Sequence, residues 1–168
     1  MATPRKTTVP AGYNTLMPYL RVKGALKALD FYKAAFGAKE KFRLMMGDKV
    51  GHAELDFGDC LLMLSEEFPE MGIIGPKTLG GTSMMLSHYV ADVDKATAKA
   101  AAAGAKITQP PQDEFYGDRT AKLEDPFGHV WSLQGRIETV SPKQMQKRLD
   151  AMMGVAPAKG PAKKKPKP

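Results

Sequence analysis

The chain carries the same pattern of elements twice. An extended run at 19–22 leads into a helix-like stretch that stops at Gly37, and a second run at 89–93 leads into an alanine-rich stretch that stops at Gly104. Each copy then continues into extended segments closed by a Phe-Gly turn, and an apolar strand follows each turn. A duplicated unit that cannot bury its own apolar faces has to pair with its copy. We therefore expect two similar halves, with a groove between them where binding or chemistry should be sought.

Length and composition favour one compact domain. With 168 residues and 43% hydrophobic composition, the chain can bury a single sizeable core. No apolar run approaches the roughly 20 residues that cross a bilayer, and residues 1–12 lack the apolar core of a secretory signal. We therefore expect no membrane partner and a cytoplasmic location. Cys60 is the single cysteine, so an intrachain disulfide is excluded. It lies in an apolar run, which favours a small buried residue over a metal ligand.

The net charge of +7 arises mainly from the end of the chain. Residues 159–168 hold five lysines and no acidic residue, and without them 20 basic residues face 18 acidic ones. A segment of Lys, Pro, Ala and Gly cannot bury enough apolar surface to order itself, so residues 155–168 are predicted to form a disordered tail. We do not expect nucleic acid as a partner, apart from weak, salt-sensitive contacts of this tail.

Turn signals and hydrophobic periodicity set the expected boundaries. These are a loose leader at 1–13, a first module at 14–66, a Gly- and Pro-rich linker at 67–81, a second module at 82–140 and a C-terminal helix at 141–154. Ser141 followed by a first-turn proline is typical of a helix start, and an apolar stripe predicts that this helix packs against the rest. Pro110 and Pro111 are expected to interrupt any strand, because proline cannot donate to a ladder.

One predicted strand, at 50–57, gathers polar residues. Alternate strand residues point to opposite sides, so His52, Glu54 and Asp56 share one face. Such a face is either turned toward solvent or forms the wall of a wet cavity, and both interpretations are kept.

Several segments together resemble a known family. They are Tyr19-Leu20-Arg21-Val22, the run at 31–38, His52-Ala53-Glu54-Leu55, Gly117-Asp118-Arg119, the run at 125–131 and Ser141-Pro142. Their order, over about residues 14–150, is similar to the PhnB-like branch of the glyoxalase/bleomycin-resistance/dioxygenase proteins, the vicinal oxygen chelate superfamily. The resemblance implies an α+β fold of paired βαβββ modules that form a curved mixed sheet around a cavity, commonly completed in a homodimer. Activity does not follow from such a match.

The resemblance also implies where a metal would bind. In metal-using members, His, Gln or Glu ligands come from the first and last strands of each module and leave a position open, so that the cation can act as a Lewis acid. Aligning the halves puts Met17, His88, Leu62 and Ser132 at these positions. Only His88 ligates a divalent cation well, so we expect no metal and no other cofactor. A shifted alignment would bring in Gln134 or Glu54, which keeps a divalent metal ion as the alternative.

Two classes of function follow. The first is a metal-free protein that binds a small organic molecule, partly aromatic or anionic, such as an antibiotic or a metabolite. The alternative is a metal-dependent lyase or dioxygenase of the glyoxalase class acting on a small vicinal-oxygen substrate, with His88 in the metal shell and a carboxylate or Gln134 completing it. The incomplete ligand set favours the first. The predicted ligand-binding residues are Tyr19, His52, Glu54, His88, Tyr116, Arg119, Trp131 and Gln134.

Some of these residues also have plain structural explanations. His88 fits an ordinary strand histidine, and Trp131 fits either the core or an organic-ligand pocket. Arg119 either pairs with Asp118 or Glu124, or offers its planar guanidinium to an anionic group.

Overall fold

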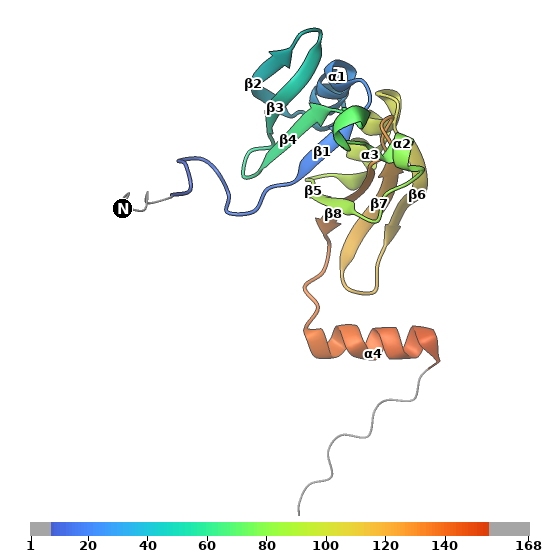
Figure 1. Ribbon diagram of the computed structural model, residues 1–168. Helices are drawn as coiled ribbons and strands as arrows, with labels where there is room; N and C mark the ends of the chain where they lie inside the picture. Colours follow the sequence, from blue (N-terminus) through green and yellow to red (C-terminus); the bar gives the residue numbers. More distant parts are fainter. Residues whose placement is uncertain (1–7, 155–168) are drawn as a thin grey trace, which may run out of the picture.

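The computed structural model describes residues 8–154, in which the order β-α-β-β-β occurs twice (Figure 1). The first module contains β1 (Tyr19–Val22), α1 (Ala25–Phe36), β2 (Lys39–Met46), β3 (Lys49–Asp56) and β4 (Leu61–Glu66). The second contains β5 (Met85–Tyr89), α3 (Val93–Ala102), β6 (Lys106–Asp113), β7 (Asp118–Glu124) and β8 (Val130–Arg136). Between them lie a 3-10 turn, η1 (Pro69–Met71), and α2 (Pro76–Leu79), and α4 (Pro142–Met153) comes last. The disordered tail predicted at 155–168, and residues 1–7 of the predicted leader, lie outside the described residues.

Each module folds into its own four-stranded mixed sheet. The strand orders are β1-β4-β3-β2 and β5-β8-β7-β6. In both sheets the first strand runs parallel to the last, and the other neighbours are antiparallel. The matching orders confirm the predicted α+β class and the paired βαβββ modules.

The two helices α1 and α3 lie against each other, and each covers one face of its own sheet (Figure 1). An apolar stripe along α1 explains this packing, because its residues Leu29 and Tyr32 are fully buried. Aromatic side chains of both modules meet here, with the ring of Trp131 4.5 Å from that of Phe36 between centroids. The modules therefore share one hydrophobic core.

The strand β6 continues through Pro110 and Pro111, so the predicted interruption is wrong. It is the outer strand of its sheet and pairs with β7 on one side alone. A proline, which has no backbone N–H, is tolerated there because no strand on the other side needs that donor. The prolines still leave a mark, since the register between β6 and β7 shifts between Gln109 and Gln112.

The helix α4 stands apart from the two modules (Figure 1). Ser141 and Gln144 form a capping box at its start, as the sequence predicts. The predicted packing of its apolar stripe is only partial, because no residue of α4 is buried and Met152 is 68% exposed. Arg148 ties it to the second module by donating to the carbonyl oxygen of Phe115 at 3.0 Å. Among residues 8–154, no helix is long and apolar enough to cross a membrane.

Candidate functional site

Three predicted ligand-binding residues lie together on the face of the first sheet that points away from α1. The strand β3 directs His52 and Glu54 to this side, and Tyr19 reaches them from β1 across β4. The Tyr19 hydroxyl lies 2.9 Å from His52 Nδ1, and His52 Nε2 lies 3.4 Å from Glu54 Oε1. Tyr13 completes this hydrogen-bonded row of side chains, because its hydroxyl lies 2.9 and 2.7 Å from the two carboxylate oxygens of Glu54.

Glu54 is the buried member of this hydrogen-bonded row, at 2% exposure. A buried carboxylate is costly unless hydrogen bonds replace its water, and Tyr13 and His52 supply them here. The hydrogen bond to Glu54 raises the pKa of the Tyr13 hydroxyl, which keeps that group a donor. Glu54 therefore holds the rings of Tyr13 and His52 in fixed positions from beneath.

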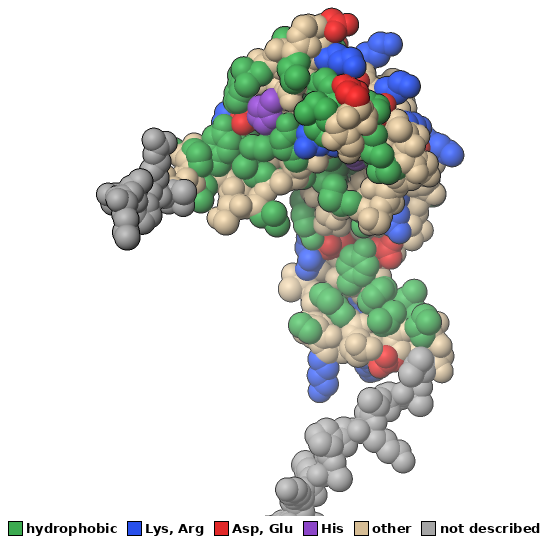
Figure 2. All heavy atoms as spheres, in the orientation of Figure 1, with side chains coloured by type: hydrophobic (Ala, Val, Ile, Leu, Met, Phe, Trp, Pro, Cys, Tyr) green, Lys and Arg blue, Asp and Glu red, His purple; other side chains and the backbone are tan. Residues whose placement is uncertain are grey.

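Above Glu54, the rings of Tyr19, Phe42 and His52 form what we call the aromatic shelf. Ring centroids are 5.5 Å apart for Tyr19 and His52 and 5.7 Å apart for Phe42 and His52. Tyr19 and Phe42 remain 37% and 40% exposed, and hydrophobic side chains gather over this module in Figure 2. The guanidinium of Arg21 lies over the Tyr19 ring at 4.2 Å. Flat, accessible rings beside a cation suit an aromatic molecule with an anionic group.

Two other predicted residues, Tyr116 and Gln134, belong to the second module. Gln134 pairs in register with Thr120 of the neighbouring strand. The Thr120 hydroxyl donates to Glu114 at 3.0 Å. Burial, followed by the charge of Glu114, raises the pKa of the Tyr116 hydroxyl. These residues form a polar group on the second sheet, whereas the aromatic shelf lies on the first.

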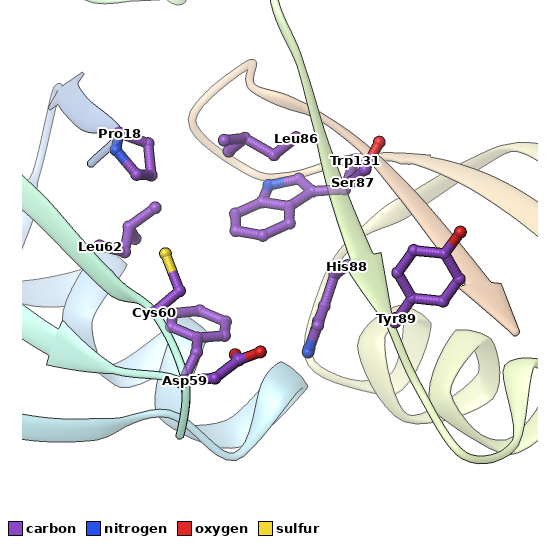
Figure 3. Close-up of a pocket in the computed structure, with 10 residues that line it drawn as sticks. Pro18, Asp59, Cys60, Leu62, Leu86, Ser87, His88, Tyr89 and Trp131 are labelled. Atoms are coloured by element: carbon purple, nitrogen blue, oxygen red, sulfur yellow. The ribbon is translucent and has the colours of Figure 1, made fainter. Parts of the chain in front are cut away.

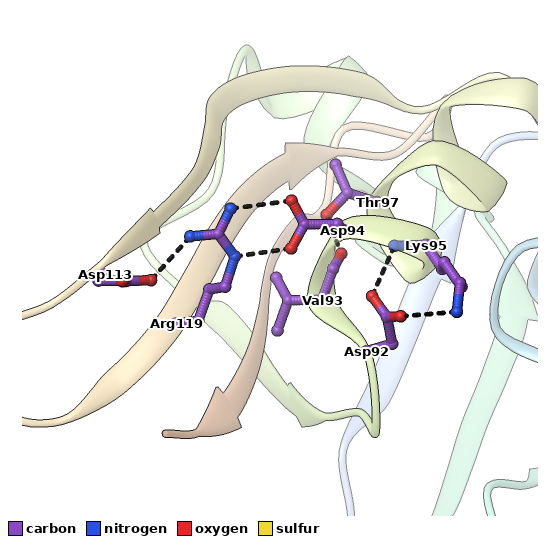
Figure 4. A network of polar contacts seen from close by, with 7 residues as sticks. All are labelled: Asp92, Val93, Asp94, Lys95, Thr97, Asp113 and Arg119. Carbon is purple, nitrogen blue, oxygen red and sulfur yellow. Dashed lines mark hydrogen bonds and ion pairs between the residues drawn. The ribbon is translucent and has the colours of Figure 1, made fainter. Parts of the chain in front are cut away.

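Arg119 is engaged in ion pairs (Figure 4). Its Nε and Nη2 donate to both carboxylate oxygens of Asp94 at 2.6 and 2.8 Å, and its Nη1 donates to Asp113 at 2.7 Å. These bonds raise the pKa of Arg119 further above its ordinary value. The partners are neither Asp118 nor Glu124, so the pairing expected from the sequence is wrong. Two carboxylates already occupy the planar fork that was predicted to meet a ligand.

His88 and Trp131 line a pocket of about 310 Å³ between the modules (Figure 3). His88 pairs in register with Leu133, and its strand neighbour Leu86 pairs with Trp131, so His88 shares the side of the sheet on which Trp131 is buried. In Figure 3, Asp59 and Cys60 form the opposite wall, from the first module.

The His88 imidazole packs edge-on against two phenylalanine rings, with centroids 5.7 Å from Phe36 and 5.4 Å from Phe57. Its Nδ1 is buried and has no hydrogen-bond partner among the described residues. Leaving such an atom unpaired costs about 1–3 kcal/mol. Burial also lowers the pKa of His88 below its ordinary 6.5, although the charge of Asp59 opposes this.

This lowered pKa predicts a pH dependence of stability. Below pH 6.5 the unfolded chain binds a proton at His88, whereas the folded chain binds it only at a lower pH. The part of the unfolding free energy that comes from neutral His88 is therefore present above pH 6.5 and is lost as the pH falls toward the folded-state pKa. In a His88→Phe variant, the fall in melting temperature on acidification below pH 6.5 should be smaller than in the unmodified protein. Equal falls in both proteins would contradict the lowered pKa.

The residues present do not fit a catalytic metal. Among residues 8–154, no group of three His, Cys, Asp or Glu side chains is arranged to hold an ion. His52 and Glu54 are close enough to share one, but a third strong donor does not join them. Of the positions that the aligned halves suggest, Ser132 pairs with Ser87, and His88 pairs with Leu133. Because neighbouring residues alternate, Ser132 and His88 point to opposite faces of the second sheet.

Three residues beside the predicted set were missed. Arg21 follows Tyr19 by two positions, so strand alternation could have placed it on the same face. Phe42 lies opposite Glu54 only because β2 and β3 pair in this register. Tyr13 lies in a loop whose sequence shows no periodicity, and nothing local indicates that it contacts Glu54.

Comparison of the sequence with known proteins gives a family match. The Glyoxalase/Bleomycin resistance protein/Dioxygenase superfamily matches residues 12–133. An uncharacterized protein of Mycobacterium tuberculosis strain H37Rv is 36% identical over 140 residues, covering 81% of this chain and 82% of that protein. An uncharacterized protein of Mycobacterium bovis has the same identity and covers 81% of this chain and 92% of its own length.

Solved structures show the same architecture. TioX from Micromonospora sp. ML1 is similar at 28% identity with a TM-score of 0.59, over 73% of this chain and 99% of TioX. The fosfomycin resistance protein FosX from Listeria monocytogenes, solved with Mn(II) and sulfate, is similar at 16% identity with a TM-score of 0.57, over 81% of this chain and 97% of FosX. The second likeness concerns the fold alone.

Proposed function

Because the chain belongs to the glyoxalase/bleomycin resistance protein/dioxygenase superfamily, we propose that it binds a small organic molecule and does so without a catalytic metal. The observation that carries this proposal is the aromatic shelf, in which His52 lies within hydrogen-bond distance of both the buried Glu54 and the Tyr19 hydroxyl. We also propose a cytoplasmic location and membership of the PhnB-like branch. The order of the sequence motifs supports the branch.

The shelf sets the chemistry of the ligand. A flat aromatic body would lie against the rings of Tyr19, Phe42 and His52, where apolar contact and ring stacking both favour it. Arg21, fixed by its bond to the Ser65 hydroxyl at 2.8 Å, would meet a carboxylate or another anionic group on the same molecule. We therefore propose a small aromatic ligand with an anionic group.

The donor set supports the metal-free form of this function. A metal-dependent lyase or dioxygenase needs three or four protein ligands around one open position. His52 and Glu54 offer two, and the Glu54 carboxylate is already hydrogen-bonded by Tyr13.

We also propose that the protein forms a homodimer that covers the shelf. Exposed apolar side chains follow β2 beside the shelf and recur at the start of β5; they are Phe42, Leu44, Met45, Met46, Met84 and Met85. Grouped exposed side chains of this kind are typical of protein interfaces. A second copy seated along β2 would close the open side of the ligand site.

The test is a ligand screen with two matched variants. Aromatic carboxylates and aromatic antibiotics are titrated into the protein in a calorimeter, and the mass in solution is measured by light scattering. For any ligand found, His52→Ala should weaken binding roughly tenfold or more, which corresponds to about 1.4 kcal/mol. Arg119→Ala should leave the affinity unchanged, because Asp94 and Asp113 already hold that guanidinium.

Three outcomes would refute the proposal. The first is that no aromatic carboxylate or aromatic antibiotic in the screen binds the unmodified protein. The second is an equal loss of affinity in His52→Ala and Arg119→Ala. The third is a stoichiometric divalent ion whose removal by a chelator abolishes ligand binding, since this would favour the metal-dependent alternative.

A further inference from the structure

We propose that the pocket between the modules is a second binding site, which takes a small, uncharged aromatic molecule carrying one hydrogen-bond donor. This pocket is distinct from the aromatic shelf, because none of Tyr19, Phe42 and His52 lines it. Its walls come from both modules, as Figure 3 shows, with Asp59 and Cys60 on one side and His88 and Trp131 on the other.

The shape and the apolar walls favour a flat molecule. The rings of Phe57 and Trp131 are close to parallel, at 19° with centroids 6.1 Å apart, and Leu62 adds an aliphatic wall. The volume of about 310 Å³ is at the lower end of the range of small-molecule sites. A molecule of two fused aromatic rings matches these walls better than a long or branched one.

His88 supplies the polar contact. Its Nδ1 is buried, so the ring nitrogen that a molecule in the pocket can reach is Nε2, which has no hydrogen-bond partner among the described residues and would accept from a donor on the ligand. In a neutral imidazole one nitrogen donates and the other accepts, and a donor on the ligand selects the tautomer in which Nε2 accepts. Burial lowers the pKa of His88, which favours this neutral ring.

The charge in the pocket selects against anions. Asp59 is the single charged side chain among the described residues that line it. An anionic ligand would meet this carboxylate without a neighbouring cation, at a cost that a neutral hydroxyl or amide avoids. The aromatic shelf, beside Arg21, has the opposite preference, so the two sites should discriminate by charge.

The chain carries two natural reporters of this pocket. Its single cysteine and its single tryptophan both line the cavity. Burial raises the pKa of the Cys60 thiol, so Cys60 should react slowly with an alkylating reagent and should be shielded further by a bound molecule. In a proton–nitrogen correlation NMR spectrum, the indole N–H of Trp131 should give a single side-chain signal, and this signal should shift when the pocket fills.

The experiment compares 2-naphthol, naphthalene and 2-naphthoate on the full chain. We expect 2-naphthol to slow the alkylation of Cys60 and to shift the Trp131 indole signal in a saturable way. Naphthalene, which lacks the donor, should bind roughly five- to tenfold more weakly, and 2-naphthoate should have no effect at either reporter. In His88→Phe, which keeps a ring in the pocket, the preference for 2-naphthol over naphthalene should disappear.

Each alternative outcome would overturn the second site. Equal binding of 2-naphthol and naphthalene to the unmodified protein would remove the role of His88, and this comparison stands even if His88→Phe does not fold. Protection by 2-naphthoate would contradict the selection against anions, and a Cys60 that never reacts would show that the pocket is closed. If His52→Ala abolished the effects, they would belong to the aromatic shelf, whereas failure of the shelf as a ligand site would leave this test unchanged.

Discussion

An Asp125→Ala variant should lose about 3–5 kcal/mol of unfolding free energy. Asp125 is 2% exposed, and its Oδ1 accepts hydrogen bonds from the backbone N–H groups of Phe127 and His129, each at 2.9 Å. Its Oδ2 accepts from the Tyr32 hydroxyl at 2.8 Å and from the Trp131 indole N–H at 3.0 Å. Removing the carboxylate would leave four buried donors unpaired, and each unpaired donor carries a desolvation cost.

The matched control is Tyr32→Phe, measured by urea denaturation beside Asp125→Ala. This variant removes one donor, the Tyr32 hydroxyl, and leaves the carboxylate bonded to the other three, so it should cost only about 1–2 kcal/mol. Tyr32 lies on α1 and Asp125 in the turn before β8, so this bond also joins the two modules. A loss in Asp125→Ala no larger than that in Tyr32→Phe would show that Asp125 does not organise the turn and the core together.

The role of Asp125 illustrates what local sequence predicts and what it does not. The run at 125–128 predicts a turn, because Pro and Gly follow an aspartate, and the structure contains that turn. The bond from Tyr32 joins residues 93 positions apart. No periodicity or turn signal within either segment contains that contact, since it exists only after the two modules pack.

The fold was predictable because its signal is repeated. The helix stripe at 25–36, the glycine stop at Gly37 and the two Phe-Gly turns each have a local physical cause, and the duplication doubles the information. The errors lie where position in the sheet overrides local preference. The strand β6 accepts Pro110 and Pro111 because it is an outer strand, and strand order cannot be obtained from that segment alone.

The candidate site was predictable only in part, for a reason of register. Alternation along one strand correctly predicted that His52 and Glu54 share a face, and the structure adds Tyr19 to them. His88 required the pairing of β5 with β8, where a shift of one residue moves a side chain to the other face. The sequence grouped His88 and Trp131 with Tyr19 in one cavity, whereas the structure places them in the pocket between the modules.

A Gly117→Ala variant is expected to lose about 2–5 kcal/mol of unfolding free energy. Gly117 has φ +92°, a conformation that residues with a Cβ rarely adopt. A Cβ built there would overlap the carbonyl oxygen of Glu138 and would lie 2.8 Å from Cγ2 of Val140. The Gly117 carbonyl oxygen accepts from the backbone N–H groups of Ile137 at 3.0 Å and Glu138 at 2.9 Å, so the substitution pushes apart two segments that these bonds hold together.

Gly58→Ala separates backbone strain from overlap. Gly58 also has a positive φ, +105°, but a Cβ there would meet nothing within 4 Å, so only the backbone strain of about 1–2 kcal/mol should appear. In Gly117→Ala, hydrogen exchange of the Ile137 and Glu138 amides should also accelerate, whereas in Gly58→Ala it should not. Equal losses in the two variants would mean that the segment after β8 moves aside freely, and then Gly117 would not fix the position of the neighbouring Tyr116.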